Sequence, residues 1–278
     1  MPRGLAYLRA KSLRDLSLPM SCGQQSHRRP SYRYRLAPHV RQCWTGDYAI
    51  LLDLRRGEYF GVSCEDALVL ANSVGDFLPS LSNPSGHHAY LAPSEMQLIA
   101  ELIDKGLLTT DCCLRNRTPS QQHWPPRREL IREYEKVTPQ TKSGHLLRFM
   151  FAAVTAKCLL RWRTLEYAVA RSHRRRLRAL VASESSDDQG QLQWELEQLR
   201  QHVSSFRRFA PLFLNSINAC LLLSFVLIEY LATYRLYPAW IFGVTTAPFA
   251  AHCWVQHHDT VLNDSPEFVS QFQSILIA

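Results

Sequence analysis

Alternating apolar and polar residues characterise the first third of the chain. Three ranges follow the period of two that is typical of strands: 32–36, 48–54 and 58–62. Two ranges follow a helical period instead: 64–74 and 95–105. The pattern therefore predicts a small unit made of a three-stranded sheet and helices.

Longer apolar stripes in the second half are spaced for helices. Residues 143–182 and 191–209 have this spacing, and the range 216–234 is so rich in apolar residues that it predicts a buried helix. Residues 250–256 and 261–264 then suit two strands joined by a turn. Together the two halves predict an α+β fold.

The apolar range around residue 220 is too short for a membrane span. Only about ten apolar residues precede Glu229, whereas a span needs roughly twenty. Arg235 and Pro238 interrupt the range further. We expect a buried helix and no membrane contact.

Proline-rich composition marks a domain boundary. Thr-Pro, Trp-Pro-Pro and Thr-Pro-Gln all fall in the region that leads up to residue 142, which is typical of an interdomain linker. We therefore divide the chain into a flexible basic tail (1–30), a first domain (31–112), a linker (113–142) and a second domain (143–278).

The composition narrows the functional classes. The 278-residue chain carries a net charge of +8 at pH 7, which favours anionic partners. Its eight cysteines show neither a Cys-x-x-Cys pair nor a zinc spacing, so we expect no metal site, reduced thiols and a cytoplasmic location. No Walker A motif or dinucleotide-binding glycine loop is present. The densest positive cluster, 171–178, lacks interleaved aromatic residues, which favours a solvated helix end over a nucleic-acid contact.

Cys220, His252 and Asp264 are the candidate catalytic residues. A thiolate attacks a carbonyl, an imidazole carries the proton, and a carboxylate fixes the imidazole tautomer. Cys220 falls in the first turn of the expected helix, where free N–H groups and the helix dipole favour a thiolate. A hairpin centred on His258 would place His252 opposite Asp264. On residue type alone, a buried structural cysteine and a structural histidine remain the alternatives.

Several motifs near the C-terminus carry a family resemblance. They are Cys220, Ala251-His252-Cys253-Trp254-Val255, Val261-Leu262-Asn263-Asp264 and the closing Phe-Gln-Ser-Ile-Leu-Ile-Ala, with 32 residues from Cys220 to His252 and 12 from His252 to Asp264. Together they resemble the C-terminal half of lasso-peptide B proteins, the leader peptidases of lasso-peptide maturation. The resemblance implies a transglutaminase-like, papain-like fold without a cofactor, in which these three residues are catalytic. Cys253 departs from the usual family residue, and strand alternation predicts that it points away from His252.

A second set of motifs lies in the first domain. The run Ile50-Leu51-Leu52-Asp53-Leu54-Arg55-Arg56-Gly57-Glu58-Tyr59-Phe60, closed by residues 101–108, resembles the recognition element for ribosomal-peptide leaders. The resemblance implies a small winged-helix-like domain whose third strand, 58–62, accepts the leader as an extra edge strand. The leader-binding candidates are then Arg55, Arg56, Glu58, Tyr59, Phe60 and Val62. Phe60 is also a candidate core residue, and the two arginines are equally compatible with a solvated turn.

The two resemblances imply a cysteine leader peptidase that cuts a lasso-peptide precursor before macrocyclisation. Its partners would be the precursor leader and an asparagine-synthetase-like lasso cyclase, through which any ATP requirement would arise. No nucleic-acid partner is expected. Two alternatives stay open: a transglutaminase-like acyltransferase or cross-linker, and a non-enzymatic winged-helix regulator that binds nucleic acid.

Overall fold

A computed structural model describes residues 10–12, 34–74, 77, 93–110, 125–130, 143–183, 188–213 and 220–278. The chain divides into two compact units, one spanning residues 8–120 and the other containing residues 121–278. Among the described residues, no helix is both long and apolar enough to cross a membrane.

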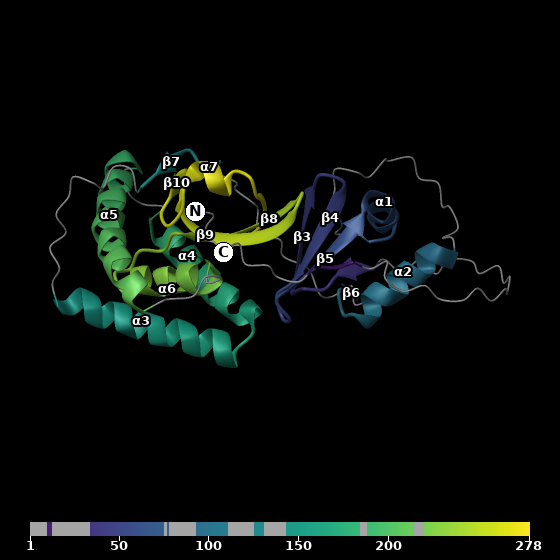
Figure 1. The fold of residues 1–278 in the computed structure, drawn as a ribbon, viewed down its shortest axis with the longest axis horizontal. Helices are drawn as coiled ribbons and strands as arrows, with labels where there is room; N and C mark the ends of the chain where they lie inside the picture. Colours follow the sequence, from purple (N-terminus) through teal and green to yellow (C-terminus); the bar gives the residue numbers. More distant parts are fainter. Residues whose placement is uncertain are drawn as a thin grey trace. The chain divides into compact units, whose positions relative to one another are not determined.

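An antiparallel meander forms the centre of the first unit. It consists of β3 (Val40–Thr45), β4 (Tyr48–Asp53) and β5 (Glu58–Ser63). A fourth strand, β1 (Ala10–Ser12), pairs in parallel with β5, which gives the order β1-β5-β4-β3 (Figure 1). This strand lies inside the range 1–30 that the sequence assigned to a flexible tail.

The first strand of the meander differs from the prediction. Of the range 32–36, the structure describes residues 34–36, and β2 (Arg35–Leu36) within them pairs with β6 (Leu108–Thr109) in a separate ribbon. β3 was not predicted, because only Val40 and Cys43 of its six residues are buried and the alternation is weak. Its hairpin to β4 turns at Gly46, whose φ of 56° is a conformation that glycine adopts without strain.

Two helices cover one face of this sheet. Ser63 caps α1 (Cys64–Ser73), since its side chain accepts a hydrogen bond from the Asp66 N–H, and α2 (Pro93–Asp104) follows. The core between helices and sheet is formed by apolar residues from both layers: Leu36, Val40, Ala49, Leu51, Phe60, Val62, Ala67, Leu70, Ile99, Leu102 and Leu108. A three-stranded antiparallel sheet with helices is therefore established, whereas the winged-helix assignment is not.

The second unit contains a five-stranded sheet with the order β11-β8-β9-β10-β7. Its strands are β7 (Arg128–Glu129), β8 (Ala239–Thr246), β9 (Phe249–His257), β10 (Thr260–Val261) and β11 (Gln273–Ile277). Its helices are α3 (Ser143–Trp162), α4 (Leu165–Ser183), α5 (Asp188–Phe213), α6 (Cys220–Ala232) and α7 (Pro266–Val269). The range 143–182, predicted to be helical, contains two helices, α3 and α4.

Helix α6 is the central helix of this unit and packs against both β9 and α3 (Figure 1). Residues 224–231 are all buried, which explains why the sequence shows no polar face over this range. The ring of Phe225 stacks on Trp240 of β8, with ring centroids 4.8 Å apart. This contact fixes α6 against the sheet, and through it the position of Cys220 at the start of the helix.

Two arginines of the basic cluster 171–178 have a structural role. Glu229 of α6 is buried, and its carboxylate is bound by Arg171 at 3.1 Å and by Arg175 at 2.7 Å. A buried carboxylate without such partners would be strongly destabilising. These two arginines therefore join α4 to the central helix.

Candidate active site

Cys220 is the first residue of α6 and is partly exposed. Backbone N–H groups at the start of a helix have no intrahelical partner, and together with the helix dipole they stabilise negative charge there. The sequence also offers Asn215, Ser216 and Asn218 as capping residues for this helix, and all three lie outside the described residues. Within the described residues α6 begins at Cys220, and because residues 214–219 lie outside them, the first-turn position stays a prediction.

The imidazole of His252 and the carboxylate of Asp264 are hydrogen-bonded. The distance from His252 Nε2 to Asp264 Oδ2 is 2.8 Å, and the second carboxylate oxygen accepts the Ser265 N–H at 2.9 Å. Both side chains are only about 10 % exposed. Since Nε2 is engaged by Asp264, Nδ1 is the ring nitrogen that remains for Cys220.

The hairpin that joins His252 to Asp264 has a different register from the one predicted. Thr260 pairs with His257 and Val261 with Gln256, so the turn is His258-Asp259. The register is therefore shifted by one residue relative to a turn centred on His258. The contact forms nevertheless because the ladder ends at Val261. Asn263 then bonds the Val255 N–H through its side chain, and this bend carries Asp264 to the imidazole.

Aromatic rings surround the imidazole of His252. Phe268, Phe272 and Trp254 have ring centroids 5.2, 5.4 and 6.2 Å from it. Gly243 of β8 pairs directly with His252, and a Cβ at Gly243 would lie 2.8 Å from both Trp254 and Phe272. The glycine therefore leaves room for the rings that enclose the imidazole, and the enclosure limits the access of water.

Electrostatics favour an ion pair between Cys220 and His252. A hydrogen bond from Cys253 and the interactions with His252 outweigh burial and lower the pKa of the Cys220 thiol from 9.0 to about 5. Burial alone would lower the pKa of His252, but the hydrogen bonds and charges of Asp264 and Cys220 raise it from 6.5 to about 9. At neutral pH these values give a thiolate beside an imidazolium, which is the reactive form of a cysteine nucleophile.

Cys253 also belongs to the site, through contacts with Ser224 and Cys220 of α6 and not with His252. Its Sγ lies 3.3 Å from Ser224 Oγ, and it hydrogen-bonds the Cys220 thiol. Burial and the neighbouring Cys220 raise the pKa of Cys253 well above its usual value, so it stays a protonated donor. The signal that could have indicated this role is the position of Cys253 directly beside His252.

Ser224 determines where the Cys253 proton can go. The Ser224 hydroxyl donates to the Cys220 carbonyl at 2.6 Å and accepts from the Trp240 indole N–H at 2.9 Å. Because the Ser224 hydroxyl proton is donated to the Cys220 carbonyl, Ser224 can only accept a hydrogen bond from Cys253. The single Cys253 proton therefore has two acceptors, Ser224 Oγ and Cys220 Sγ, and ionisation of Cys220 draws it to the sulfur.

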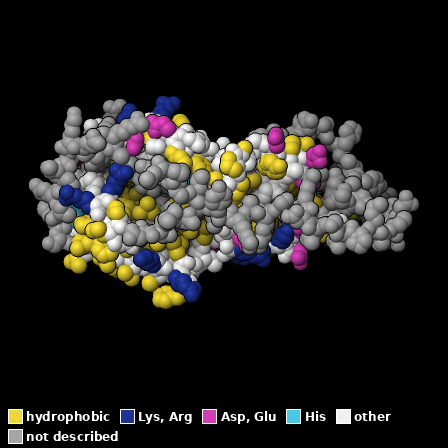
Figure 2. Space-filling view, in the orientation of Figure 1, with side chains coloured by type: hydrophobic (Ala, Val, Ile, Leu, Met, Phe, Trp, Pro, Cys, Tyr) yellow, Lys and Arg dark blue, Asp and Glu magenta, His cyan; other side chains and the backbone are white. Residues whose placement is uncertain are grey.

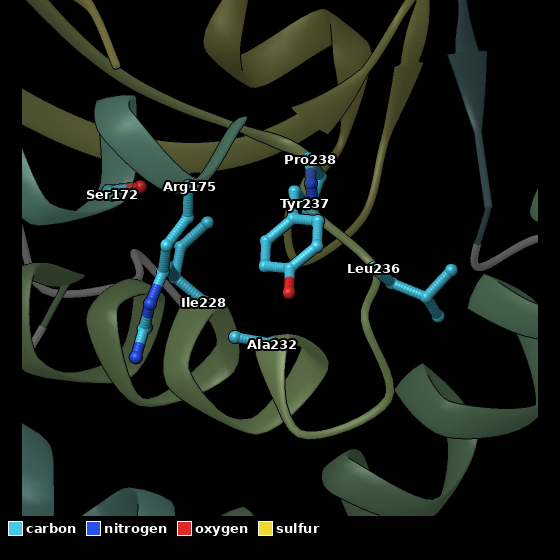
Figure 3. Close-up of a pocket in the computed structure, with 7 residues that line it drawn as sticks. All are labelled: Ser172, Arg175, Ile228, Ala232, Leu236, Tyr237 and Pro238. Atoms are coloured by element: carbon cyan, nitrogen blue, oxygen red, sulfur yellow. The ribbon is translucent and has the colours of Figure 1, made fainter. Parts of the chain in front are cut away.

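A small cavity in the second unit lies apart from these residues. Its volume of about 10 Å³ is near the size that one water molecule needs. Figure 3 shows its lining residues: Ser172, Arg175, Ile228, Ala232, Leu236, Tyr237 and Pro238. None of the three candidate catalytic residues lines it, so it does not bear on the chemistry of the thiol.

The leader-binding candidates lie on or beside β5. Tyr59, Phe60 and Val62 are buried, and the last two are in the core, so an added strand would meet their backbone more than their side chains. Arg55 and Arg56 are exposed, and the Arg56 guanidinium donates to the Lys105 carbonyl at 2.9 Å. The remaining candidate, Glu58, is partly exposed and pairs with Asp53 in the ladder.

Comparison with known proteins finds a superfamily domain within the second unit. A family model described as transglutaminase-like superfamily matches residues 152–277. The chain therefore contains a transglutaminase-like superfamily domain, and Cys220, His252 and Asp264 all lie within it. That superfamily includes cysteine peptidases and acyltransferases. Searches of the curated proteins and of the solved structures found no match.

Proposed function

We propose that this protein is a cysteine leader peptidase that separates the leader of a lasso-peptide precursor from its core. The observation that carries the proposal is the arrangement of Cys220, His252 and Asp264 within a transglutaminase-like domain. The motifs around these residues support the choice of a lasso-peptide precursor as substrate, through their resemblance to lasso-peptide B proteins.

The reaction would begin from the ion pair. The Cys220 thiolate attacks the carbonyl carbon at the leader–core junction, and the His252 imidazolium gives its proton to the leaving amine of the core. The leader is then held as a thioester. Neutral His252 takes a proton from water, the resulting hydroxide attacks the thioester, and the leader leaves as a free carboxylate. Asp264 keeps the imidazole oriented throughout.

The first unit would hold the leader by strand addition on β5. The backbone of β5 supplies the hydrogen bonds of an added strand. In the structure β1 occupies this edge and pairs with Tyr59, Phe60 and Gly61. The leader therefore has to displace β1, a strand of only three residues, before it can pair along the full length of β5.

The remaining expectations are part of the same proposal. The reaction needs no cofactor, because the thiolate, imidazole and carboxylate account for each step. The freed core amine passes to an asparagine-synthetase-like cyclase, through which any ATP requirement arises. Because the leader is held on the same chain, the second contact is effectively intramolecular and the cleavage site need not bind the core tightly.

The experiment is incubation of the purified full chain with its precursor, with and without the cyclase. The precursor is expected as a short open reading frame beside the gene. The proposal predicts a leader with a free carboxylate, and no cleavage by Cys220→Ala. Cleavage by Cys220→Ala at the wild-type rate would overturn it.

A transferase is the second candidate, because the same thioester can be captured by an amine. Mass spectrometry separates the two outcomes. An amide adduct of the leader, in place of a free carboxylate, would identify an acyltransferase.

A further inference from the structure

Helix α3 has apolar residues on two opposite faces. The inner face, which includes Phe149, Ala152 and Ala156, is fully buried. Leu147, Phe151, Val154 and Trp162, here called the outer stripe, are instead 72, 67, 56 and 76 % exposed. Their spacings of four, three and eight residues place them along one side of the helix, opposite the inner face.

The outer stripe runs along most of the length of α3. With a rise of about 1.5 Å per residue, it extends over roughly 22 Å of helix. Figure 2 shows hydrophobic side chains gathered where α3 lies in Figure 1, with Lys and Arg side chains beside them. Exposed apolar patches of this kind on a folded protein mark interaction sites.

The charges on α3 are of one sign. The helix contains Arg148, Lys157 and Arg161 and no aspartate or glutamate. Arg148 is engaged by the Thr233 carbonyl at 2.7 Å and by the ring of Tyr234, whereas Lys157 and Arg161 are exposed beside the outer stripe. A partner surface that complements α3 is therefore apolar where it meets the outer stripe and negatively charged where it meets Lys157 and Arg161.

We propose that α3 binds the surface of an anionic lipid bilayer through the outer stripe. The stripe would insert between the lipids, and Lys157 and Arg161 would lie at the negatively charged headgroups. Trp162 closes the stripe at the end of the helix, and tryptophan is the residue type that prefers the membrane interface.

A lipid surface fits this helix better than a second protein helix does. The side chains of the outer stripe project from a single helix and are 56–76 % exposed. Phe151 and Trp162 are large aromatic side chains. A fluid bilayer can surround them without presenting a surface of matching shape, which a protein partner would need. The expectation of no membrane contact came from the short apolar range near residue 220, whereas α3 is a different element and contact with a surface needs no span.

The test is flotation of the full chain with phosphatidylcholine vesicles, with and without phosphatidylglycerol. The stripe variant is Leu147→Gln/Phe151→Gln/Trp162→Gln. The matched control is Val181→Gln/Trp194→Gln, which changes residues that are 71 and 59 % exposed on other helices. A Lys157→Gln/Arg161→Gln variant tests the charges.

We expect the wild type and the matched control to float with the phosphatidylglycerol vesicles and not with phosphatidylcholine alone. The stripe variant should lower the bound fraction about tenfold or more, and the charge variant should make binding weaker and less sensitive to salt. An unchanged pH midpoint of Cys220 reactivity confirms that each variant is folded.

Three outcomes would overturn the proposal. They are absence of wild-type flotation, equal flotation of the stripe variant, and a wild-type oligomer that the stripe variant dissociates. The last result would identify the outer stripe as an interface between copies of the chain. The proposal does not depend on the peptidase activity, so cleavage of a precursor without vesicle binding would reject this inference alone.

Discussion

Replacement of Cys253 tests how the site keeps Cys220 ionised. The hydrogen bond from Cys253 is the largest contribution that lowers the pKa of the Cys220 thiol to about 5. Cys253→Ala removes this donor and leaves burial, which raises the pKa, in place. Cys253→Ser keeps a donor at nearly the same position and is the matched control.

The size of the effect follows from the strength of one hydrogen bond to a charged group. Such a bond contributes about 1.5–3 kcal/mol, and one pH unit corresponds to about 1.4 kcal/mol. Cys253→Ala should therefore raise the ionisation midpoint of Cys220 by about one to two pH units. With a midpoint near 6.5 instead of 5, the thiolate fraction at pH 5.5 falls about eightfold, while at pH 7 it falls by only about a quarter.

The assay is the pH dependence of the reaction of Cys220 with a small disulfide reagent, followed by mass spectrometry of the peptide that contains Cys220. The midpoint is the quantity to measure, because a thiolate of higher pKa is intrinsically more nucleophilic and this partly offsets the lower thiolate fraction. We expect a raised midpoint in Cys253→Ala and a nearly unchanged one in Cys253→Ser. If both variants keep the wild-type midpoint, the proposed donor role of Cys253 is wrong.

Three further predictions concern other parts of the molecule. Asp264→Asn should lower the pKa of His252 from about 9, because the carboxylate that stabilises the imidazolium is lost, and the upper limb of the bell-shaped pH–rate profile should move to lower pH; an unmoved upper limb would contradict this. Gly243→Ala should displace Trp254 and reduce cleavage about tenfold or more, since the new Cβ would lie 2.8 Å from that ring. Wild-type activity of this variant would show that the ring can move without disturbing the site. Deletion of residues 1–30 removes β1 and should tighten leader binding several-fold in a fluorescence anisotropy titration; unchanged or weaker binding would show that β1 does not compete.

Local patterns predicted most of the elements in both units. β4 and β5 alternate clearly and were found within one residue of their observed bounds, and the described helix α6, with its apolar composition, lies within the predicted range 216–234. β3 was missed because its alternation is weak, although Gly46-Asp47 is a hairpin signal that could have indicated it. β1 could not be found, because three residues carry too little pattern.

In the candidate site, too, features that are local in the sequence could be predicted, whereas features that depend on tertiary contacts could not. The spacing of Cys220, His252 and Asp264 indicated the three residues that the structure brings together. It did not indicate the register, which depends on the turn at His258-Asp259 and on the bend after Val261. The roles of these residues in catalysis stay predictions.

The surroundings of the thiol could not be predicted, because they come from distant parts of the chain. Trp240 and Cys253 reach Ser224 through the packing of α6 against β8 and β9, and no sequence spacing reports those contacts, whereas the bond from Ser224 to the Cys220 carbonyl is local to α6. Strand alternation predicted that Cys253 points away from His252, so no role in the site was assigned to it. That rule assigns side chains to faces of a sheet, but it does not say which groups a helix end can reach.

The most direct test of leader cleavage through Cys220 is digestion of the precursor in heavy-oxygen water. Mass spectrometry of the released leader then reports how the thioester was resolved. Hydrolysis through Cys220 predicts a leader that carries one heavy oxygen atom in its new carboxylate, and predicts no leader release by Cys220→Ala. A labelled leader released by Cys220→Ala, or an unlabelled amide adduct from the wild type, would contradict the account.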